Sequence, residues 1–335
     1  MHYQPLDQTR QISIKGLVLW TVLLVCLMVW LAYGIIQGVQ KYFSYPVSTV
    51  IDINYVRSLD FPAVTICNYN QFRKSKIMHD KEIIQQVLVA LATGNSSNVD
   101  WETYDETYAN HTFNLTKTTL EYGHQIEDML IECRWNTGEE CGTENLTQVI
   151  TDFGLCYTFN GKTSERRLTV SRAGATRGLK LRLSVQQDEY FWGDNTGAGF
   201  KVLVHTQGEM PLVNQLGNSI SPGFETLFAI RSIIKFYNFS RKEFYTQSDI
   251  CECPVPCKSE FYLTSLSMGF WPSDFIGENI ARSKNETKEY IRDNYLELRI
   301  FYDILTIEKI SQAASYNALD LQSKFKVYFK GRAHD

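Results

Sequence analysis

Residues 16 to 36 read GLVLWTVLLVCLMVWLAYGII, and no charged side chain occurs from Gly16 to Gln40. An apolar run of this length can cross a hydrocarbon core of about 30 Å as a helix. A cleavable signal peptide has a shorter apolar run and a small-residue cleavage site, neither of which this stretch shows. We therefore predict a membrane protein with one N-terminal transmembrane helix over residues 16–40 and membrane lipid as a partner.

Charge and glycosylation signals predict which side of the membrane each part occupies. Arg10 and Lys15 outweigh Asp7 before the span, which favours a cytoplasmic N-terminus over residues 1–15. Six N-x-S/T acceptor sequences follow the span, and such sequences are glycosylated only in secreted or extracellular segments. These predicted glycosylation sites are Asn95, Asn110, Asn114, Asn145, Asn238 and Asn285. The chain after the span is therefore predicted to be extracellular.

Composition excludes several classes of function. The 335 residues are 44% hydrophobic and 21% charged, which is enough apolar content for a packed core. The formal net charge of -4 and the absence of a basic run speak against nucleic-acid binding. We find no HExxH motif, no phosphate-binding loop and no G-x-S-x-G turn, so we expect no enzyme and no cofactor.

Seven of the eight cysteines follow the span, and Cys26 lies inside it. Cys133 and Cys141 flank RWNTGEE, a turn-forming segment that can bring two sulfur atoms together, so we predict a local disulfide. CECPVPC holds Cys251, Cys253 and Cys257 on an extended segment with two prolines, so these three need distant partners. A zinc site would lack a fourth ligand at a suitable spacing, and we expect no metal. An odd number of outer cysteines indicates an incomplete ectodomain.

Apolar periodicity predicts a mixed α+β, β-rich ectodomain. Residues 44–67 suggest two strands, residues 80–92 a helix, residues 95–120 an exposed loop and residues 124–133 a second helix. Residues 152–206 alternate short β-rich runs with glycine turns, which predicts antiparallel sheet. Residues 273–294 suggest helix and residues 296–305 a strand. We find no second apolar run of about 20 residues, and the basic C-terminal stretch from Leu321 cannot span a membrane.

Several segments resemble one membrane protein family in the order in which that family has them. FPAVTICNYNQFRKSKI over residues 61–77 resembles the signature that follows its first span. The further segments are GHQIEDMLIEC, EECG, FGLCYTFN, QQDEY, QLGNSISPGFET, CECPVPCKSEFY and LSMGFWPS. On these motifs the chain is identified as a member of the degenerin, epithelial sodium channel and acid-sensing ion channel family, from the span to about residue 317.

The resemblance implies a trimeric sodium channel whose ectodomain, residues 41–317 here, is built of palm, knuckle, finger, β-ball and thumb. It implies disulfides between Cys67 and Cys156 and between Cys133 and Cys141. In the family, the cysteines that match Cys251, Cys253 and Cys257 bond to the thumb helices, and most of the thumb is missing from this sequence. Residues 318–335 form a divergent tail where the family has its second, pore-forming span.

The resemblance also implies sites for ligands and gating. Asp188 and Glu189 match carboxylates of an acidic pocket, where crowding would raise their pKa values. Asp52 and Asp303 match the lower palm and form a second candidate acidic cluster. Tyr45 matches an aromatic residue that couples the ectodomain to the span, and Leu305 and Thr306 match a palm linker involved in desensitisation.

The gating ligand stays open between a proton, a peptide and a bile acid. Acid-sensing members have a His pair just outside the span, where this chain has Pro46 and Val47. That difference weakens the case for proton gating. The segment SYPVST looks closer to peptide-gated and bile-acid-sensitive relatives.

We therefore predict a subunit of a ligand-gated, amiloride-sensitive sodium channel at the plasma membrane. Its partners are sodium ions and other subunits of the same family, and we expect it not to conduct alone. Two alternatives remain at this stage. One is a single-span adhesion or receptor protein with a disulfide-stapled ectodomain. The other is a non-functional splice product that is retained in the endoplasmic reticulum because its thiols are unpaired.

Overall fold

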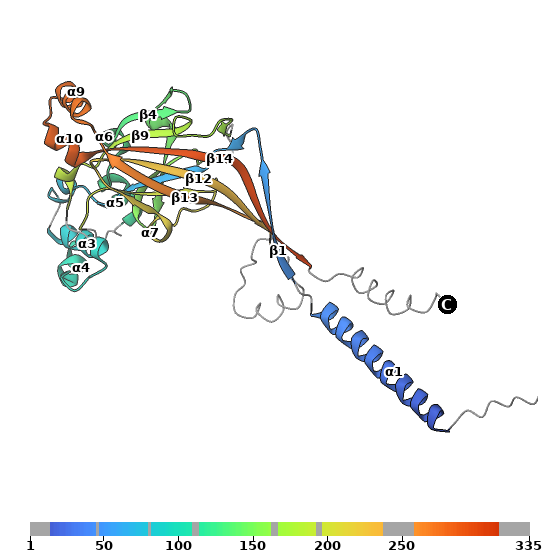
Figure 1. The fold of residues 1–335 in the computed structure, drawn as a ribbon. Coiled ribbons are helices and arrows are strands. Elements are labelled where there is room, and N and C mark those ends of the chain that lie inside the picture. Colours follow the sequence, from blue (N-terminus) through green and yellow to red (C-terminus); the bar gives the residue numbers. More distant parts are fainter. Residues whose placement is uncertain are drawn as a thin grey trace, which may run out of the picture. The chain divides into compact units, whose positions relative to one another are not determined.

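The computed structural model describes residues 14–44, 47–79, 82–108, 114–161, 167–191, 196–236 and 258–314. The chain divides into two compact units. One holds Met1–Ile51, Phe236–Lys258 and Ile310–Asp335, and the other holds Asp52–Lys235 and Ser259–Lys309. The first unit contains α1 (Ile14–Phe43), a helix long and apolar enough to cross a membrane (Figure 1). It covers the span predicted over residues 16–40.

The larger unit is built mainly from two antiparallel-rich sheets. The seven-stranded sheet runs β13 (Lys258–Phe270), β12 (Phe224–Phe236), β14 (Tyr295–Ala314), β9 (Gly178–Ser184), β4 (Leu130–Trp135) and β5 (Glu139–Cys141), and β1 (Val47–Tyr55) pairs with β14. The five-stranded sheet runs β11 (Asn218–Ile220), β10 (Phe200–His205), β3 (Ala63–Asn68), β7 (Gly154–Phe159) and β6 (Leu146–Thr151). β2 (Leu59–Asp60) and β8 (Thr169–Val170) form a separate pair. The predicted β-rich ectodomain is confirmed.

The main hydrophobic core draws on both sheets. Alternate residues of β9 and β14, such as Leu181 and Leu298, are fully buried, and so are Ile66 and Tyr157 from the second sheet. Phe61 packs edge-on against Trp135, Phe159 and Tyr302, with ring centroids 4.7–6.4 Å apart. Because side chains alternate across a strand, the residues between these apolar positions face away from this core.

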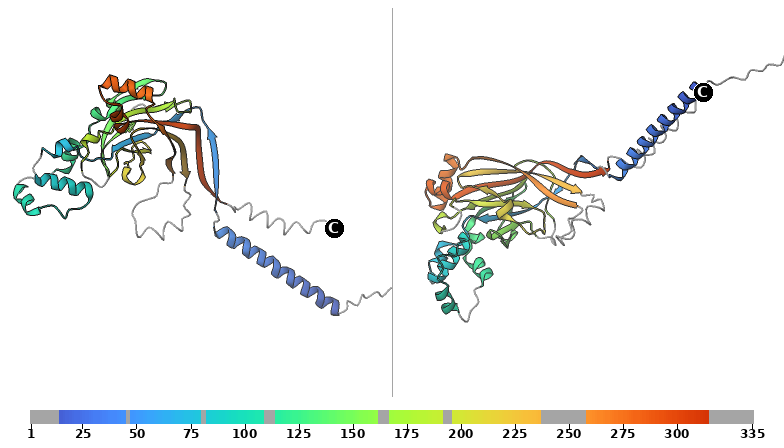
Figure 2. Two further views of the ribbon diagram at one scale, coloured as in Figure 1. Left: turned by 60° about the vertical axis from the view of Figure 1, so that its left-hand side comes forward. Right: turned by 90° about the horizontal axis from the view of Figure 1, so that it is seen from below.

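Short helices flank the sheets (Figure 2). They are α2 (Lys74–Ile77), α3 (Glu82–Thr93), α4 (Trp101–Tyr108), α5 (Leu115–Tyr122), α6 (Ile126–Met129), α7 (Val213–Leu216), α9 (Asp274–Lys284) and α10 (Lys288–Asn294), with 3-10 turns η1 (Thr143–Asn145) and η2 (Gln187–Glu189). The helix predicted over residues 80–92 corresponds to α3, which buries Ile83, Ile84, Val87 and Leu88 but leaves Leu91 exposed. Gly94 follows α3 with a φ of +66°, a conformation that suits glycine. Asp80, the first residue of the predicted helix, lies outside the described residues.

Two of the predicted elements are wrong. Residues 95–120 are not a loop, because they contain α4 and the start of α5. The backbone N–H of Thr103 donates to Asp100 Oδ1 at 3.1 Å, and that of Lys117 donates to Asn114 Oδ1 at 3.0 Å, so polar side chains cap both helices. The helix predicted over residues 124–133 is only the single turn α6. From Leu130 the chain becomes β4, because pairing with β5 and β9 overrides the local helical preference.

Candidate membrane-linking and ligand-sensing sites

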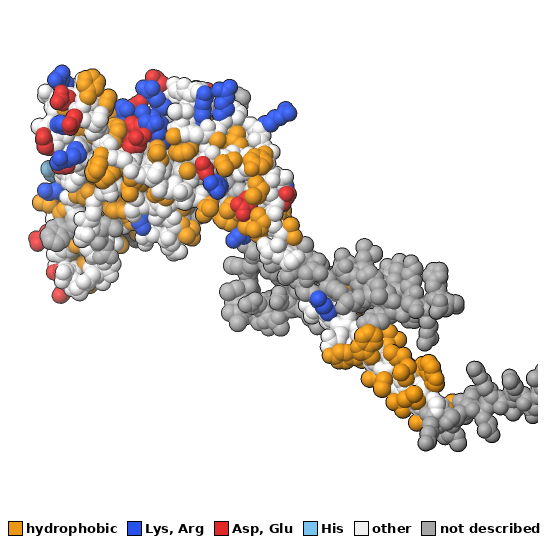
Figure 3. Space-filling view, in the orientation of Figure 1, with side chains coloured by type: hydrophobic (Ala, Val, Ile, Leu, Met, Phe, Trp, Pro, Cys, Tyr) orange, Lys and Arg blue, Asp and Glu red, His pale blue; other side chains and the backbone are white. Residues whose placement is uncertain are grey.

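Helix α1 exposes apolar side chains on every face, and Figure 3 shows those on the side in view. Twelve of its large apolar residues between Leu17 and Trp30 are 44–69% exposed in the isolated chain. A helix that is apolar on every face is stable in lipid, where its backbone hydrogen bonds are satisfied internally. Tyr45, the residue expected to couple this helix to the ectodomain, lies outside the described residues.

Each sheet carries one disulfide. Cys67 of β3 bonds Cys156 of β7, at positions directly opposite each other, and closes a separation of 89 residues. Cys133 of β4 bonds Cys141 of β5 across the turn, with a separation of 8 residues. These are the two pairs that the family resemblance implies. Cys251, Cys253 and Cys257 lie outside the described residues.

Asp188 and Glu189 lie on turn η2 but are held by different elements. Asp188 is exposed and accepts a hydrogen bond from the Tyr290 hydroxyl of α10 at 3.3 Å. Glu189 Oε2 accepts the backbone N–H of Ser75 in α2 at 2.9 Å. Burial raises the pKa of Glu189, but the hydrogen bonds from Ser75 outweigh it and leave that pKa below its usual value. The raised pKa expected from crowded carboxylates is not seen at Glu189.

The second candidate pair, Asp52 and Asp303, is also divided between separate partners. Asp52 on β1 accepts a hydrogen bond from the Asn54 side chain at 2.8 Å. Asp303 on β14 accepts one from Arg231 Nε of β12 at 3.0 Å. Asp52 thus has its hydrogen-bond partner on its own strand, and Asp303 has its partner on the neighbouring strand β12.

Leu305 and Thr306 lie within the 20-residue strand β14. The Leu305 carbonyl accepts the backbone N–H of Val56, just beyond β1, at 3.0 Å, and its side chain packs against the main core. Thr306 is buried, with 8% of its surface exposed. β14 therefore begins next to α10, and its other end pairs with β1.

A ladder of charged residues, which the sequence interpretation missed, crosses the seven-stranded sheet on the face away from the main core. Its members are Glu132, Arg134, Lys180, Arg182, Glu225, Glu297 and Arg299. Figure 3 shows acidic and basic side chains gathered over the β4 and β9 region. The pairing registers place Glu297 opposite Arg182 and Arg182 opposite Glu132.

Glu297 is the centre of this ladder and is only 1% exposed. Lys180 Nζ lies 3.3 Å from its carboxylate, and Arg182 and Arg299 each lie 2.7 Å away. Burial raises the pKa of Glu297, but the hydrogen bonds from both arginines outweigh it and hold the pKa below its usual value. The Arg182 guanidinium also lies 5.5 Å from the centre of the Trp271 ring. The only sequence signal was a charged residue at every second position in ECR, KLR and ELR.

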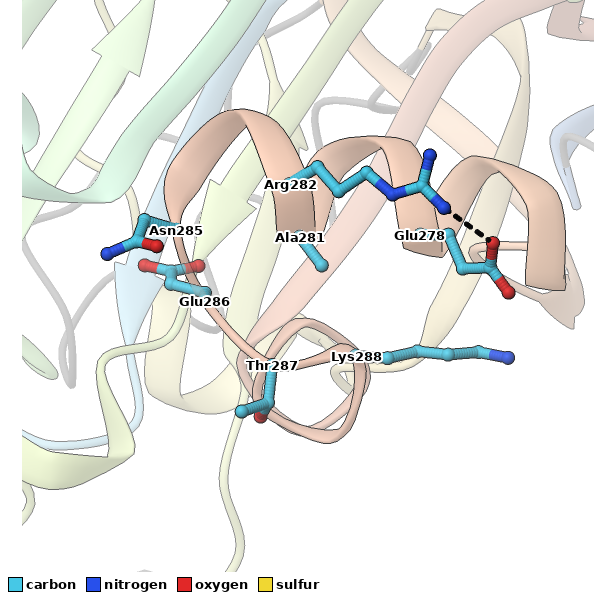
Figure 4. Close-up of a pocket in the computed structure, with 7 residues that line it drawn as sticks. All are labelled: Glu278, Ala281, Arg282, Asn285, Glu286, Thr287 and Lys288. Atoms are coloured by element: carbon cyan, nitrogen blue, oxygen red, sulfur yellow. Dashed lines mark ion pairs between the residues drawn. The ribbon is translucent and has the colours of Figure 1, made fainter.

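Four of the six predicted glycosylation sites are described, and all four are exposed: Asn95, Asn114, Asn145 and Asn285. Asn285 ends α9 with a φ of +57° and lines a shallow polar pocket of about 500 Å³ between α9 and α10 (Figure 4). Arg282 and Glu278 form an ion pair at its rim at 3.5 Å. Asn110 and Asn238 lie outside the described residues.

The fold therefore defines a class: a membrane protein with an N-terminal spanning helix and a β-rich, disulfide-bonded ectodomain. The family model described as amiloride-sensitive sodium channel matches residues 6–241 and 234–326. The chain belongs to this family of ion channels and is not an enzyme.

Individual relatives agree with this membership. Acid-sensing ion channel 1C of Danio rerio is 30% identical over 386 residues, which cover 90% of this chain and 73% of the relative. Acid-sensing ion channel 1 of Gallus gallus is 29% identical over 395 residues, covering 93% and 75%. Acid-sensing ion channel 2 of Homo sapiens is 28% identical over 387 residues, covering 91% and 75%. Among solved structures, a proton-activated chloride channel covers 94% of this chain at 12% identity, with a TM-score of 0.44 that is too low to equate the folds.

These alignments also locate a difference from the relatives. Each alignment is longer than this chain of 335 residues, so the relatives contain internal residues that have no counterpart here. The two segments of the family match meet at residues 234–241, at the end of β12. The family model thus matches this chain in two pieces that overlap at the end of β12.

Proposed function

We propose that this chain is a subunit of a ligand-gated, amiloride-sensitive sodium channel that assembles with other subunits of its family as a trimer and does not conduct alone. Family membership is the observation that carries this proposal. The first half extends the channel activity of the family to this chain. The second half follows the sequence expectation that the thumb and the second span have no counterpart in this sequence.

The proposed topology places residues 1–15 in the cytoplasm, 16–40 in the membrane and 41–317 outside the cell, with 318–335 as a tail. The exposed asparagines at 95, 114, 145 and 285 support an extracellular ectodomain, because a glycan needs an accessible side chain. The Asn114 and Asn145 side chains accept local backbone hydrogen bonds through Oδ1, which leaves Nδ2 available for a glycan. We place the chain in the plasma membrane because it belongs to a family of plasma-membrane channels.

Strand β14 supports a route between ligand sensing and the membrane. It begins directly after α10, whose Tyr290 contacts Asp188, and it pairs with β1, which follows α1 in the sequence. Ligand binding near η2 would change the position of α10 and of the N-terminal end of β14, which follows it directly. Leu305 and Thr306 would then transmit the change along the strand. The ligand itself, whether a proton, a peptide or a bile acid, is left to the experiment.

The test is two-electrode recording from oocytes that express this chain alone, human acid-sensing ion channel 2 alone, or both. Surface biotinylation is measured in parallel. We expect no amiloride-sensitive sodium current from this chain alone, and at least a twofold change in the partner's current at equal partner surface level. Acid, peptides and bile acids are applied in turn to each combination.

The matched control carries Leu24→Arg and Met28→Arg in α1. Each arginine near the centre of a span costs about 2.5–3.5 kcal/mol of insertion free energy, so this control should lose both surface exposure and any effect on the partner. An amiloride-sensitive current from this chain alone would refute the non-conducting half of the proposal. Intracellular retention with no effect on the partner would instead identify a non-functional product. The adhesion alternative no longer has support, because the chain belongs to a channel family.

A further inference from the structure

Strand β13 forms one edge of the seven-stranded sheet, beside β12 (Figure 1). It is 13 residues long, and among the described residues no strand pairs with its outer edge. Proteins usually protect such an edge with charged residues, prolines or a covering element. The run FYLTSLSMGF from Phe261 to Phe270 holds no charged residue and no proline. The backbone of this edge is therefore open to pairing with another chain.

One face of β13 stays apolar beyond the point where the core covers it. Tyr262 packs against the main hydrophobic core. Because side chains alternate along a strand, Leu266, Met268 and Phe270 lie on the same face as Tyr262. These three side chains are 37–89% exposed, and the Phe270 ring stacks on Phe224 of β12 with centroids 5.1 Å apart. The apolar face thus continues to the end of the strand without a cover from the described residues.

The first turn of α9 extends this apolar surface, because it exposes Phe275 and Ile276. We call Leu266, Met268, Phe270, Phe275 and Ile276 the edge patch. With about 200 Å² for a fully exposed aromatic side chain, the edge patch exposes about 500 Å² of apolar surface. Apolar patches of about 300–600 Å² are the largest on typical monomers and are often functional. The area is also more than half of the roughly 800 Å² that each partner buries in a standard interface.

The predicted glycans at the four described acceptor sites do not lie on this surface. The acceptors follow α3, precede α5, lie in η1 and end α9, so none of the four is on β12 or β13. Asn285 follows Ile276 by nine residues, which is about 14 Å along a helix at 1.5 Å per residue. The edge patch is therefore accessible to a protein partner.

We propose that the edge patch is the surface on which the ectodomain of a neighbouring channel subunit docks and covers the apolar face of β13. This inference rests on the proposed assembly with other subunits of the family, and it names the surface that makes the contact. Aromatic residues and methionine are enriched in protein interfaces. The open backbone edge can add main-chain hydrogen bonds to the contact. In a cyclic trimer each contact joins two different surfaces, so the edge patch meets another part of the neighbour.

The test is co-purification from oocytes that express the tagged full-length chain with human acid-sensing ion channel 2, which carries a second tag. Surface complexes are biotinylated, extracted in mild detergent and recovered through this chain. Met268→Lys combined with Phe270→Lys places two charges where the partner would bury them, so recovery of the partner should fall about tenfold or more.

The matched control is Met210→Lys combined with Leu216→Lys. These two apolar side chains are also exposed, but they lie before α7 and on α7. The control makes the same kind of change away from the edge patch, so recovery of the partner should change less than about twofold.

A second variant covers the case in which the two lysines prevent folding. Ser265→Asn creates an N-L-S acceptor on the exposed middle part of β13, and a glycan there would block the edge without removing an apolar side chain. Ser265→Gln has a similar size but creates no acceptor. Recovery of the partner should fall about tenfold or more for Ser265→Asn and change less than about twofold for Ser265→Gln.

The outcomes separate this inference from the proposed function. Undiminished recovery of the partner with both the lysine pair and Ser265→Asn would overturn the inference and leave the proposed assembly intact. No recovery of the partner by the unmodified chain would refute the proposed assembly, and the inference with it. A second tagged copy of this chain is measured in parallel. If the variants lose only this self-association, the edge patch binds a second copy and the inference is also overturned.

Discussion

Replacing Glu297 by Gln tests whether the charge ladder stabilises the ectodomain. The substitution keeps the size of the side chain but removes the single negative charge that three cations share. Breaking a buried ion pair by removing one partner costs about 3–5 kcal/mol. Lys180, Arg182 and Arg299 keep 24–28% of their side-chain surface exposed, so water can hydrate them after the change. We therefore expect a loss of about 2–3 kcal/mol in the free energy of unfolding.

The assay is thermal unfolding of the full-length chain in detergent, followed by tryptophan fluorescence. For a domain of 150–250 residues, 1 kcal/mol shifts the Tm by about 2–4 °C, so the expected drop for Glu297→Gln is about 5–10 °C. Trp271 makes fluorescence a suitable probe, because its ring lies against Arg182, a direct partner of Glu297.

Glu225→Gln is the matched control. Glu225 is 30% exposed and pairs with Arg299 alone among the ladder residues, at 2.7 Å. A partly exposed pair contributes about 0–1 kcal/mol, so the Tm should drop by less than about 3 °C. Equal Tm values for the two variants would refute the view that burial makes Glu297 the centre of the ladder.

Three further predictions concern the disulfides, the glycosylation sites and the acidic turn. Cys67→Ser removes a disulfide that closes 89 residues, and Cys133→Ser removes one that closes 8 residues. Loop-closure entropy therefore predicts that the free energy of unfolding falls by about 4–5 kcal/mol and about 2–3 kcal/mol, respectively. Equal Tm shifts for the two variants would contradict this ranking. Asn285→Gln should lower the apparent mass of the chain on a gel by one glycan, and glycosidase treatment should abolish this difference. An unchanged band would show that this site carries no glycan. Because the pKa of Glu189 is lowered, its bond to Ser75 should survive at pH 6 and be lost only as the pH falls through that lowered pKa. Faster exchange of the Ser75 amide at pH 6 than at pH 7.5, after correction for the intrinsic effect of pH, would count against it.

The local sequence pattern was enough to predict those helices and strands whose structure depends mainly on their own residues. The uncharged run from Gly16 to Gln40 predicted α1, because length and apolarity alone decide whether a helix suits a bilayer. The alternation in LKLRLSV and LELRIFY predicted β9 and β14 through the period of two that a strand imposes. The ordered motifs identified the family, which the comparisons confirm.

Apart from the Cys67–Cys156 disulfide, which the family resemblance implied, the long-range contacts could not be predicted from the sequence. The segment from His124 to Cys133 has a helical pattern but becomes β4, because β9 supplies its hydrogen-bonding partners from about 50 residues away. Strand pairing also decided that Glu297 meets Arg182 and Lys180, and that the carboxylates of Asp188 and Glu189 turn to different helices. The charge of a residue and the periodicity of the apolar pattern around it can be read from the local sequence. Its neighbours, and with them its burial, ion pairs and pKa, depend on which distant strands and loops the fold brings together.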